Sequence, residues 1–191
     1  NLTFTGIDKN RDNIEFANAR KEYRGNKDIN FYVDDATNLK IENGTYDLVI
    51  SSEVIEHLTR PEELLSQIKR VLRKDGAAII TTPNKGNPMA ALRKALRFLK
   101  PIIEDKAKVA SENEHLSLKS FKEWIRLFKS AGFKVEKVKR GSLLFGGFQI
   151  DSPRILFLCA LGLDLILDYI PFSANLAENN IFTLRKKDAE D

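Results

Sequence analysis

Short apolar strands alternate with helical segments along the first two thirds of the chain, and this alternation constrains the fold most. Strand-like runs occupy residues 2–8, 30–35, 47–52, 77–82, 133–138 and 180–185. Helical patterns occupy residues 10–23, 59–75 and 117–131. Strands joined by helices in this order form parallel sheets with crossover helices. We therefore predict an α/β fold, a mostly parallel sheet with helices on both faces.

The helices carry apolar faces and termination signals. Before the fourth strand, Thr59 and Glu62 match the Ser/Thr-x-x-Glu capping box, and Gly76 supplies a stop. The predicted apolar face of this helix, residues 59–75, comprises Leu64, Leu65, Ile68, Val71 and Leu72. The helix at 117–131 is predicted to bury Phe121, Trp124, Ile125 and Phe128. The helix at 10–23 is predicted to direct Ile14, Phe16, Ala17 and Ala19 inward. Residues 47–52 contain the uninterrupted apolar run Leu48-Val-Ile50, as in a strand covered on both faces.

Size and composition indicate one soluble domain. The 191 residues are 42% hydrophobic and 30% charged, and a net charge of +4 is far below that of a dedicated nucleic-acid binder. A single cysteine excludes an internal disulfide and fits a reducing, cytoplasmic compartment. The most apolar run, residues 155–163, is far shorter than the roughly 20 residues of a membrane helix. We expect no transmembrane segment.

Acidic residues stand at the ends of two consecutive strands. Asp8 could accept hydrogen bonds from a ribose diol, or it could cap the following helix. Asp35 could accept from the exocyclic amine of adenine, or it could cap a turn. Because both strands belong to one predicted parallel sheet, the pair indicates an adenosine-like ligand across the strand tips.

Three ligand-capable side chains follow the third strand. Glu53, Glu56 and His57 stand at i, i+3 and i+4, so on a helix they would share one face. The carboxyl ends of strands are where open α/β sheets bind ligands. An active-site rim is the first hypothesis, and a short charged helix start is the alternative.

The chain resembles the class I S-adenosylmethionine-dependent methyltransferases of the broad small-molecule type. The resemblance covers about residues 3–138 and rests on Thr5-Gly-Ile-Asp8, Val33-Asp-Asp-Ala36, Tyr46-Asp-Leu-Val-Ile-Ser-Ser-Glu-Val-Ile-Glu-His57-Leu58, Arg70-Val-Leu-Arg-Lys-Asp-Gly76, Ile80-Thr-Thr-Pro-Asn84 and Ala131-Gly-Phe133, in this order. It implies a Rossmann-like sheet in which Asp8 binds the ribose hydroxyls and Asp35 the adenine amine. It places the Ala36 backbone beside the adenine, and Ser51 and Ser52 near the methionine moiety.

The family's Gly-rich loop would precede Asn1 and is absent. The resemblance also implies a missing first strand, central to the sheet and lying between the strands that start at Thr3 and Asp47, and a missing first helix. We therefore expect that the natural protein has a further N-terminal segment. These 191 residues alone should bind the cofactor poorly and be inactive.

The cluster after the third strand also resembles that of two metal-assisted groups, the small-RNA 3′-terminal 2′-O-methyltransferases and the ubiquinone-pathway O-methyltransferases. This implies Mg²⁺ or Mn²⁺ held by Glu53, Glu56 and His57, with His115 joining them. Carboxylates and imidazoles suit such ions. Two metal-free alternatives remain open: His57 acts as a general base, or the cluster is structural.

We predict a methyltransferase that acts on a small or medium-sized acceptor, most often at a hydroxyl oxygen. A non-catalytic or regulatory cofactor-binding module and a metal-assisted RNA 2′-O-methyltransferase are the alternatives; a nicotinamide-dependent dehydrogenase would not explain the cluster. Residues 1–191 form a single domain, with substrate or lid insertions at 85–111 and 141–179. The second insertion is strongly apolar, which favours an apolar or lipid-linked acceptor, a homodimer through residues 155–170, or core packing. We expect no nucleic-acid partner, because no aromatic and basic platform is evident.

Overall fold

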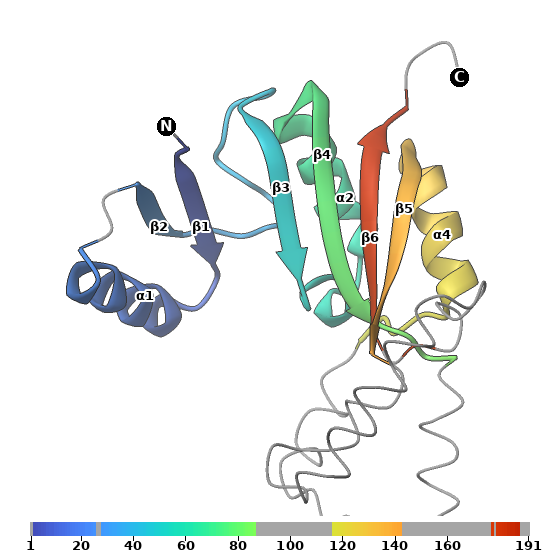
Figure 1. The fold of residues 1–191 in the computed structure, drawn as a ribbon, viewed down its shortest axis with the longest axis horizontal. Helices are drawn as coiled ribbons and strands as arrows, with labels where there is room; N and C mark the ends of the chain where they lie inside the picture. The colour runs from blue at the N-terminus through green and yellow to red at the C-terminus, as the bar shows by residue number, and fades with distance from the viewer. Residues whose placement is uncertain (1, 26–27, 87–115, 143–176, 178, 188–191) are drawn as a thin grey trace, which may run out of the picture.

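The computed structural model describes residues 2–25, 28–86, 116–142, 177 and 179–187. In chain order the elements are β1 (Phe4–Asp8), α1 (Arg11–Tyr23), β2 (Ile29–Val33), β3 (Tyr46–Ser52), the 3₁₀ turn η1 (Ile55–His57), α2 (Pro61–Val71), β4 (Leu72–Pro83), α4 (Phe121–Ser130), β5 (Phe133–Ser142) and β6 (Asn179–Lys186). Figure 1 shows their arrangement. The predicted alternation of strands and helices is confirmed.

The described strands form two separate sheets. β1 and β2 pair in parallel, and the second sheet has the order β3-β4-β6-β5. β3 and β4 are parallel, whereas β6 runs antiparallel to both β4 and β5. Figure 1 shows β1, β2 and α1 standing apart from the four-stranded sheet. The four-stranded sheet is mixed, whereas Asp8 and Asp35 stand at the ends of the two parallel strands β1 and β2.

The core lies between the four-stranded sheet and helices α2 and α4. Fully or almost fully buried are Leu64, Leu65 and Ile68 of α2, Trp124 and Phe128 of α4, and Ala78, Ile80, Phe182 and Leu184 of the strands. Phe128 meets Phe182 edge-on, with ring centroids 5.0 Å apart. These faces match the predicted 3.6-residue spacing, although Phe121 and Ile125 are only half-buried.

The predicted termini of α2 are wrong. The helix begins at Pro61 with Arg60 as N-cap and without a side-chain capping bond, so Thr59 and Glu62 form no capping box. Arg60 instead pairs with Glu63 at 2.7 Å. The helix ends at Val71 rather than near Gly76, because residues from Leu72 onward are recruited as strand β4. The capping box occurs on α4, where Ser120 and Glu123 form it.

Two apolar faces are more exposed than predicted. In α1 only Ile14 is buried, whereas Phe16 is 66% exposed, because this helix packs against a sheet of just two strands. In β3, Leu48 and Ile50 are exposed while Ser51 is buried, so the strand is covered on one face. No described strand pairs with the second edge of β1 or of β3. The resemblance places a further strand there, and that expectation stays a prediction.

Several expectations concern segments outside the described residues. These are most of both predicted insertions, the apolar segment 155–170 and His115. The division into one domain with two insertions stays a prediction. Among the helices that the structure describes, none has the length and apolar character needed to cross a bilayer.

Candidate active site

A cavity of about 770 Å³ lies between the two sheets, in the space between β1 and β3 where the resemblance places a further strand. It is bounded by β1, by the segment that follows β2, by β3 with the turn after it, and by α2. The predicted site residues on its wall are Asp8, Asp35, Ala36, Ser51, Ser52 and His57. The fold thus gathers around one space most of the residues that the sequence singled out.

Asp8 is the last residue of β1, and its side chain accepts hydrogen bonds from residues at the start of α1. Its Oδ1 accepts a hydrogen bond from the backbone N–H of Asn10 at 2.7 Å, and its Oδ2 accepts from Nδ2 of Asn13 at 2.9 Å. The N-cap of α1 is Asn10, whose side chain accepts from the N–H of Asp12, so Asp8 supports the start of the helix without being its cap. Because Asp8 is only half-buried and lines the cavity, its carboxylate can also accept from a ligand.

Asp35 follows β2 in a tight turn. Its Oδ1 accepts from the hydroxyl of Thr37 at 2.7 Å and from the Thr37 backbone N–H at 2.9 Å, and its Oδ2 lies 3.3 Å from Lys9 Nζ. The Thr37 hydroxyl chiefly, with help from the backbone bond and Lys9, lowers the pKa of Asp35 below its ordinary value. The carboxylate is thus ionised at neutral pH, so both of its oxygens accept hydrogen bonds and neither donates.

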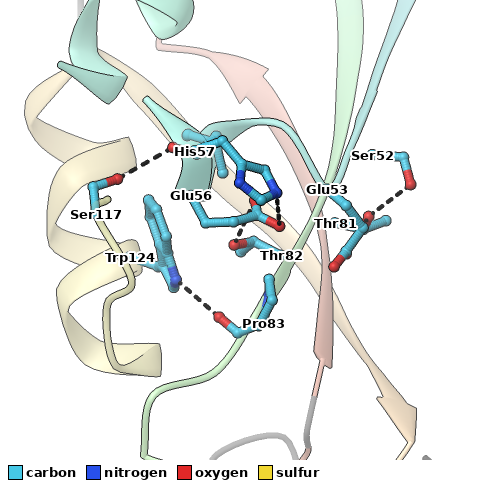
Figure 2. A network of polar contacts seen from close by, with 10 residues as sticks. Ser52, Glu53, Glu56, His57, Thr81, Thr82, Pro83, Ser117 and Trp124 are labelled. Atoms are coloured by element: carbon cyan, nitrogen blue, oxygen red, sulfur yellow. Dashed lines mark hydrogen bonds and ion pairs between the residues drawn. The ribbon is translucent and has the colours of Figure 1, made fainter. Parts of the chain in front are cut away.

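Ser51 and Ser52 point to opposite faces of β3, as strand geometry requires. Ser51 is 7% exposed, and its Oγ has no hydrogen-bond partner within the described protein. Ser52 Oγ lies 2.9 Å from Thr81 Oγ1, which donates to Glu53 Oε1 at 2.9 Å (Figure 2). Buried hydroxyls normally have a partner, so the Ser51 Oγ is an exception, although other atoms of the residue line the cavity.

The shared helical face predicted for the acidic cluster is wrong. Glu53 has a φ of 52°, and the helical turn that follows comprises only Ile55–His57. Because the chain changes direction at Glu53, that side chain turns to Thr81, whereas Glu56 turns inward to Thr82 (Figure 2). His57 lines the cavity, and its side chain is 38% exposed.

Glu56 is fully buried and only partly satisfied. Its Oε2 accepts from Thr82 Oγ1 at 3.2 Å, while its Oε1 has no hydrogen bond and lies 3.9 Å from Nε2 of His57. Burial chiefly, and then the charge of Glu53, raises the pKa of Glu56. Ser117 holds the turn in place, because its N–H donates to the Glu56 carbonyl at 2.9 Å and its Oγ to the carbonyl of Ile55.

The described residues do not support the predicted metal site. Within them, no three His, Cys, Asp or Glu side chains come together in an arrangement that could hold an ion. The carboxylates of Glu53 and Glu56 are directed to two different threonines of β4. The fourth proposed ligand, His115, lies outside the described residues.

Sequence reasoning missed the threonines that support the site. Thr37 holds Asp35, and Thr81 and Thr82 hold the two glutamates. The Asp35-x-Thr37 spacing is typical of a side-chain-capped turn and could have indicated the first contact. The other two contacts join residues more than 25 positions apart, for which the local sequence carries no signal.

Comparison with known proteins places the chain in a family. Residues 1–132 match a family model described as "Methyltransferase domain". A ubiquinone biosynthesis O-methyltransferase from Rickettsia canadensis is 37% identical over 42% of this chain and 34% of its own length. The ubiquinone/menaquinone biosynthesis C-methyltransferase UbiE of Campylobacter jejuni is 32% identical over 76% of this chain and 63% of its own. The chain thus spans less than two thirds of either curated relative.

Solved structures share the fold at low sequence identity. A S-adenosylmethionine-dependent methyltransferase from Thermotoga maritima has a TM-score of 0.66 and 16% identity, over 95% of this chain and 72% of that one. The [4+2]-cyclase SpnF has a TM-score of 0.64 and 16% identity, over 97% and 66%. Because one fold here carries differently named activities, these similarities establish architecture alone. With the family match over more than half of its length, the chain belongs to the class I S-adenosylmethionine-dependent methyltransferases.

Proposed function

We propose that the protein transfers a methyl group from S-adenosylmethionine to a hydroxyl oxygen of a small-molecule acceptor. The observation that carries this proposal is the group of polar side chains at the strand ends, on one rim of the cavity between the sheets. Two acidic strand ends, Asp8 and Asp35, lie on its wall together with Ser51 and the partly exposed imidazole of His57. Donors and acceptors for an adenosine group and a proton acceptor thus border one space.

In this proposal the β1–β2 side of the cavity holds the cofactor. Asp8 accepts from the ribose hydroxyls, and the ionised Asp35 accepts from the adenine amine beside Ala36. Ser51 lies beside the methionine moiety. When bound, S-adenosylmethionine supplies a methyl group that its sulfonium already activates. The protein therefore contributes mainly by positioning the acceptor in line with that group.

His57 takes the proton of the acceptor hydroxyl. Imidazole is suited to this role near neutral pH. Buried Glu56, 3.9 Å from the imidazole Nε2, limits the orientations open to the ring. The curated relatives are named as an O- and a C-methyltransferase, so oxygen as the acceptor atom rests on the base at the cavity wall rather than on similarity.

Further features of the acceptor are part of the same proposal. Both curated relatives are named for quinone biosynthesis, which supports an apolar acceptor. The apolar composition of the 141–179 segment agrees with that choice. We also propose that the protein is cytoplasmic and that the insertions at 85–111 and 141–179 take part in binding the acceptor.

The test is transfer of a radiolabelled methyl group by the full-length protein to pooled acceptors, with and without a chelator. We expect Asp35→Asn to weaken cofactor binding at least tenfold, whereas Asp12→Asn, an exposed acid of α1, should leave it unchanged. His57→Gln should lower transfer about 10²-fold while cofactor binding is retained. A label recovered on carbon, or full activity of the His57 variant, would refute oxygen transfer with this base.

A further inference from the structure

One segment connects the two sheets and forms part of the cavity wall. Residues 34–45 run from the end of β2 to the start of β3, and Asp35, Leu39 and Ile41 within them line the cavity. The β1–α1–β2 unit packs mainly on itself and forms no ladder with β3 (Figure 1). The position of Asp35 relative to β3 therefore depends on how this segment is held.

Arg70, near the end of α2, holds residues 34–45 through hydrogen bonds from its guanidinium group. Nη2 donates to the carbonyl of Leu39 at 2.8 Å, and Nη1 donates to the carbonyl of Ile41 and to Asn43 Oδ1, the latter at 2.9 Å. Gln67, one turn earlier on the helix, accepts from Nε at 3.1 Å and from Nη2 at 2.7 Å. The side chain is thereby fixed at both its helix end and its loop end.

The main chain of the helix end adds two contacts to the same segment. The N–H of Gly44 donates to the Arg70 carbonyl at 3.0 Å, and the N–H of Thr45 donates to the carbonyl of Val71 at 2.8 Å. These bonds fix the segment beside β3, whereas the guanidinium fixes its middle. A planar fork with five N–H groups can serve several carbonyls at once, which an ammonium point charge cannot do in the same geometry.

We propose that Arg70 is a positioning residue for the cofactor side of the cavity. By holding the carbonyls of Leu39 and Ile41 against α2, it sets the distance between Asp35 and the wall formed by β3. This inference rests on the proposed function, because it assumes that this side of the cavity receives the cofactor. It assigns the role to a residue that is absent from the cavity wall itself.

The test compares Arg70→Met and Arg70→Lys with Arg73→Met in the full-length protein. Arg73 is the matched control because its exposed guanidinium contacts only Asp47, at 2.7 Å, in the described protein. Amide hydrogen exchange of residues 37–45 is read by mass spectrometry, and affinity for S-adenosylhomocysteine by calorimetry. We expect both Arg70 variants to exchange this segment about tenfold faster and to bind about tenfold more weakly, with exchange in β4 and β6 within about twofold.

Unchanged hydrogen exchange at residues 37–45 in Arg70→Met would overturn the proposal that Arg70 clamps this segment against α2. Faster exchange with unchanged affinity would overturn its role in positioning, and faster exchange throughout β4 and β6 would show a general structural role instead. Failure of the wild-type protein to bind S-adenosylhomocysteine would contradict the proposed function, whereas the exchange measurement would still decide the clamp.

Discussion

Replacing Thr82 by valine should destabilise the protein through Glu56. Thr82 Oγ1 donates a hydrogen bond to Glu56 Oε2, and both side chains are fully buried (Figure 2). The substitution keeps the side chain's shape and removes this donor. A hydrogen bond to a charged group contributes about 1.5–3 kcal/mol, and one between neutral groups about 0.5–1.5 kcal/mol.

The stability lost in Thr82→Val should depend on pH, because burial raises the pKa of Glu56 above its ordinary value of 4.5. Below pH 4.5 the carboxyl is protonated in both folded and unfolded chains, and its full contribution to stability is present. As the pH rises, the unfolded chain loses its proton first, so stability falls until the pH passes the folded pKa. Thr82→Val should therefore cost about 1 kcal/mol at pH 4.5, where the folded carboxyl is mostly neutral, and the cost should rise toward about 2 kcal/mol as the pH increases and the carboxyl ionises.

Urea unfolding followed by the fluorescence of the single, buried tryptophan measures both values. Thr183→Val, on the other face of the adjacent strand β6, is the matched control and should stay within about 0.5 kcal/mol of wild type. Glu56→Gln should abolish the pH dependence of the Thr82→Val effect. A Thr82→Val loss that is equal at pH 4.5 and pH 8, or no larger than that of the control, would refute the reasoning.

Three further substitutions test the packing and the helix ends. Phe128→Ala should lower the free energy of unfolding by about 3–5 kcal/mol in urea titrations, because the ring is fully buried against Phe182; a loss below about 1 kcal/mol would contradict this packing. Ser120→Ala should cost about 1 kcal/mol in thermal unfolding by removing the capping box of α4, whereas Ser120→Thr should retain most of that stability. Gly132→Ala should cost about 1–3 kcal/mol by calorimetry, because φ is +82° and the new Cβ would stand 2.1 Å from Lys69 Nζ; an unchanged melting temperature would show that this turn adapts.

Much of the fold could be predicted from local patterns, because those patterns report local physics. The apolar faces of α2 and α4 follow from the 3.6-residue repeat. The end of α2 could not be predicted, since Leu72 to Gly76 become strand only when β4 finds its partner β3. The exposure of Phe16 in α1 could not be predicted either, because it depends on the number of strands in the sheet beneath the helix, which the local sequence does not indicate.

For the candidate site, the sequence by itself determined which chemical groups stand at the strand ends. Parallel strands bring their carboxyl ends to one edge, so Asp8 and Asp35 were expected to line one space, as they do. Only the tertiary structure decided how the glutamates after β3 are used. The positive φ at Glu53 breaks the helical spacing, and the partners Thr81 and Thr82 come from another strand. Contacts between distant segments depend on the packing of the whole sheet, and therefore Arg70 is visible as a clamp only in three dimensions.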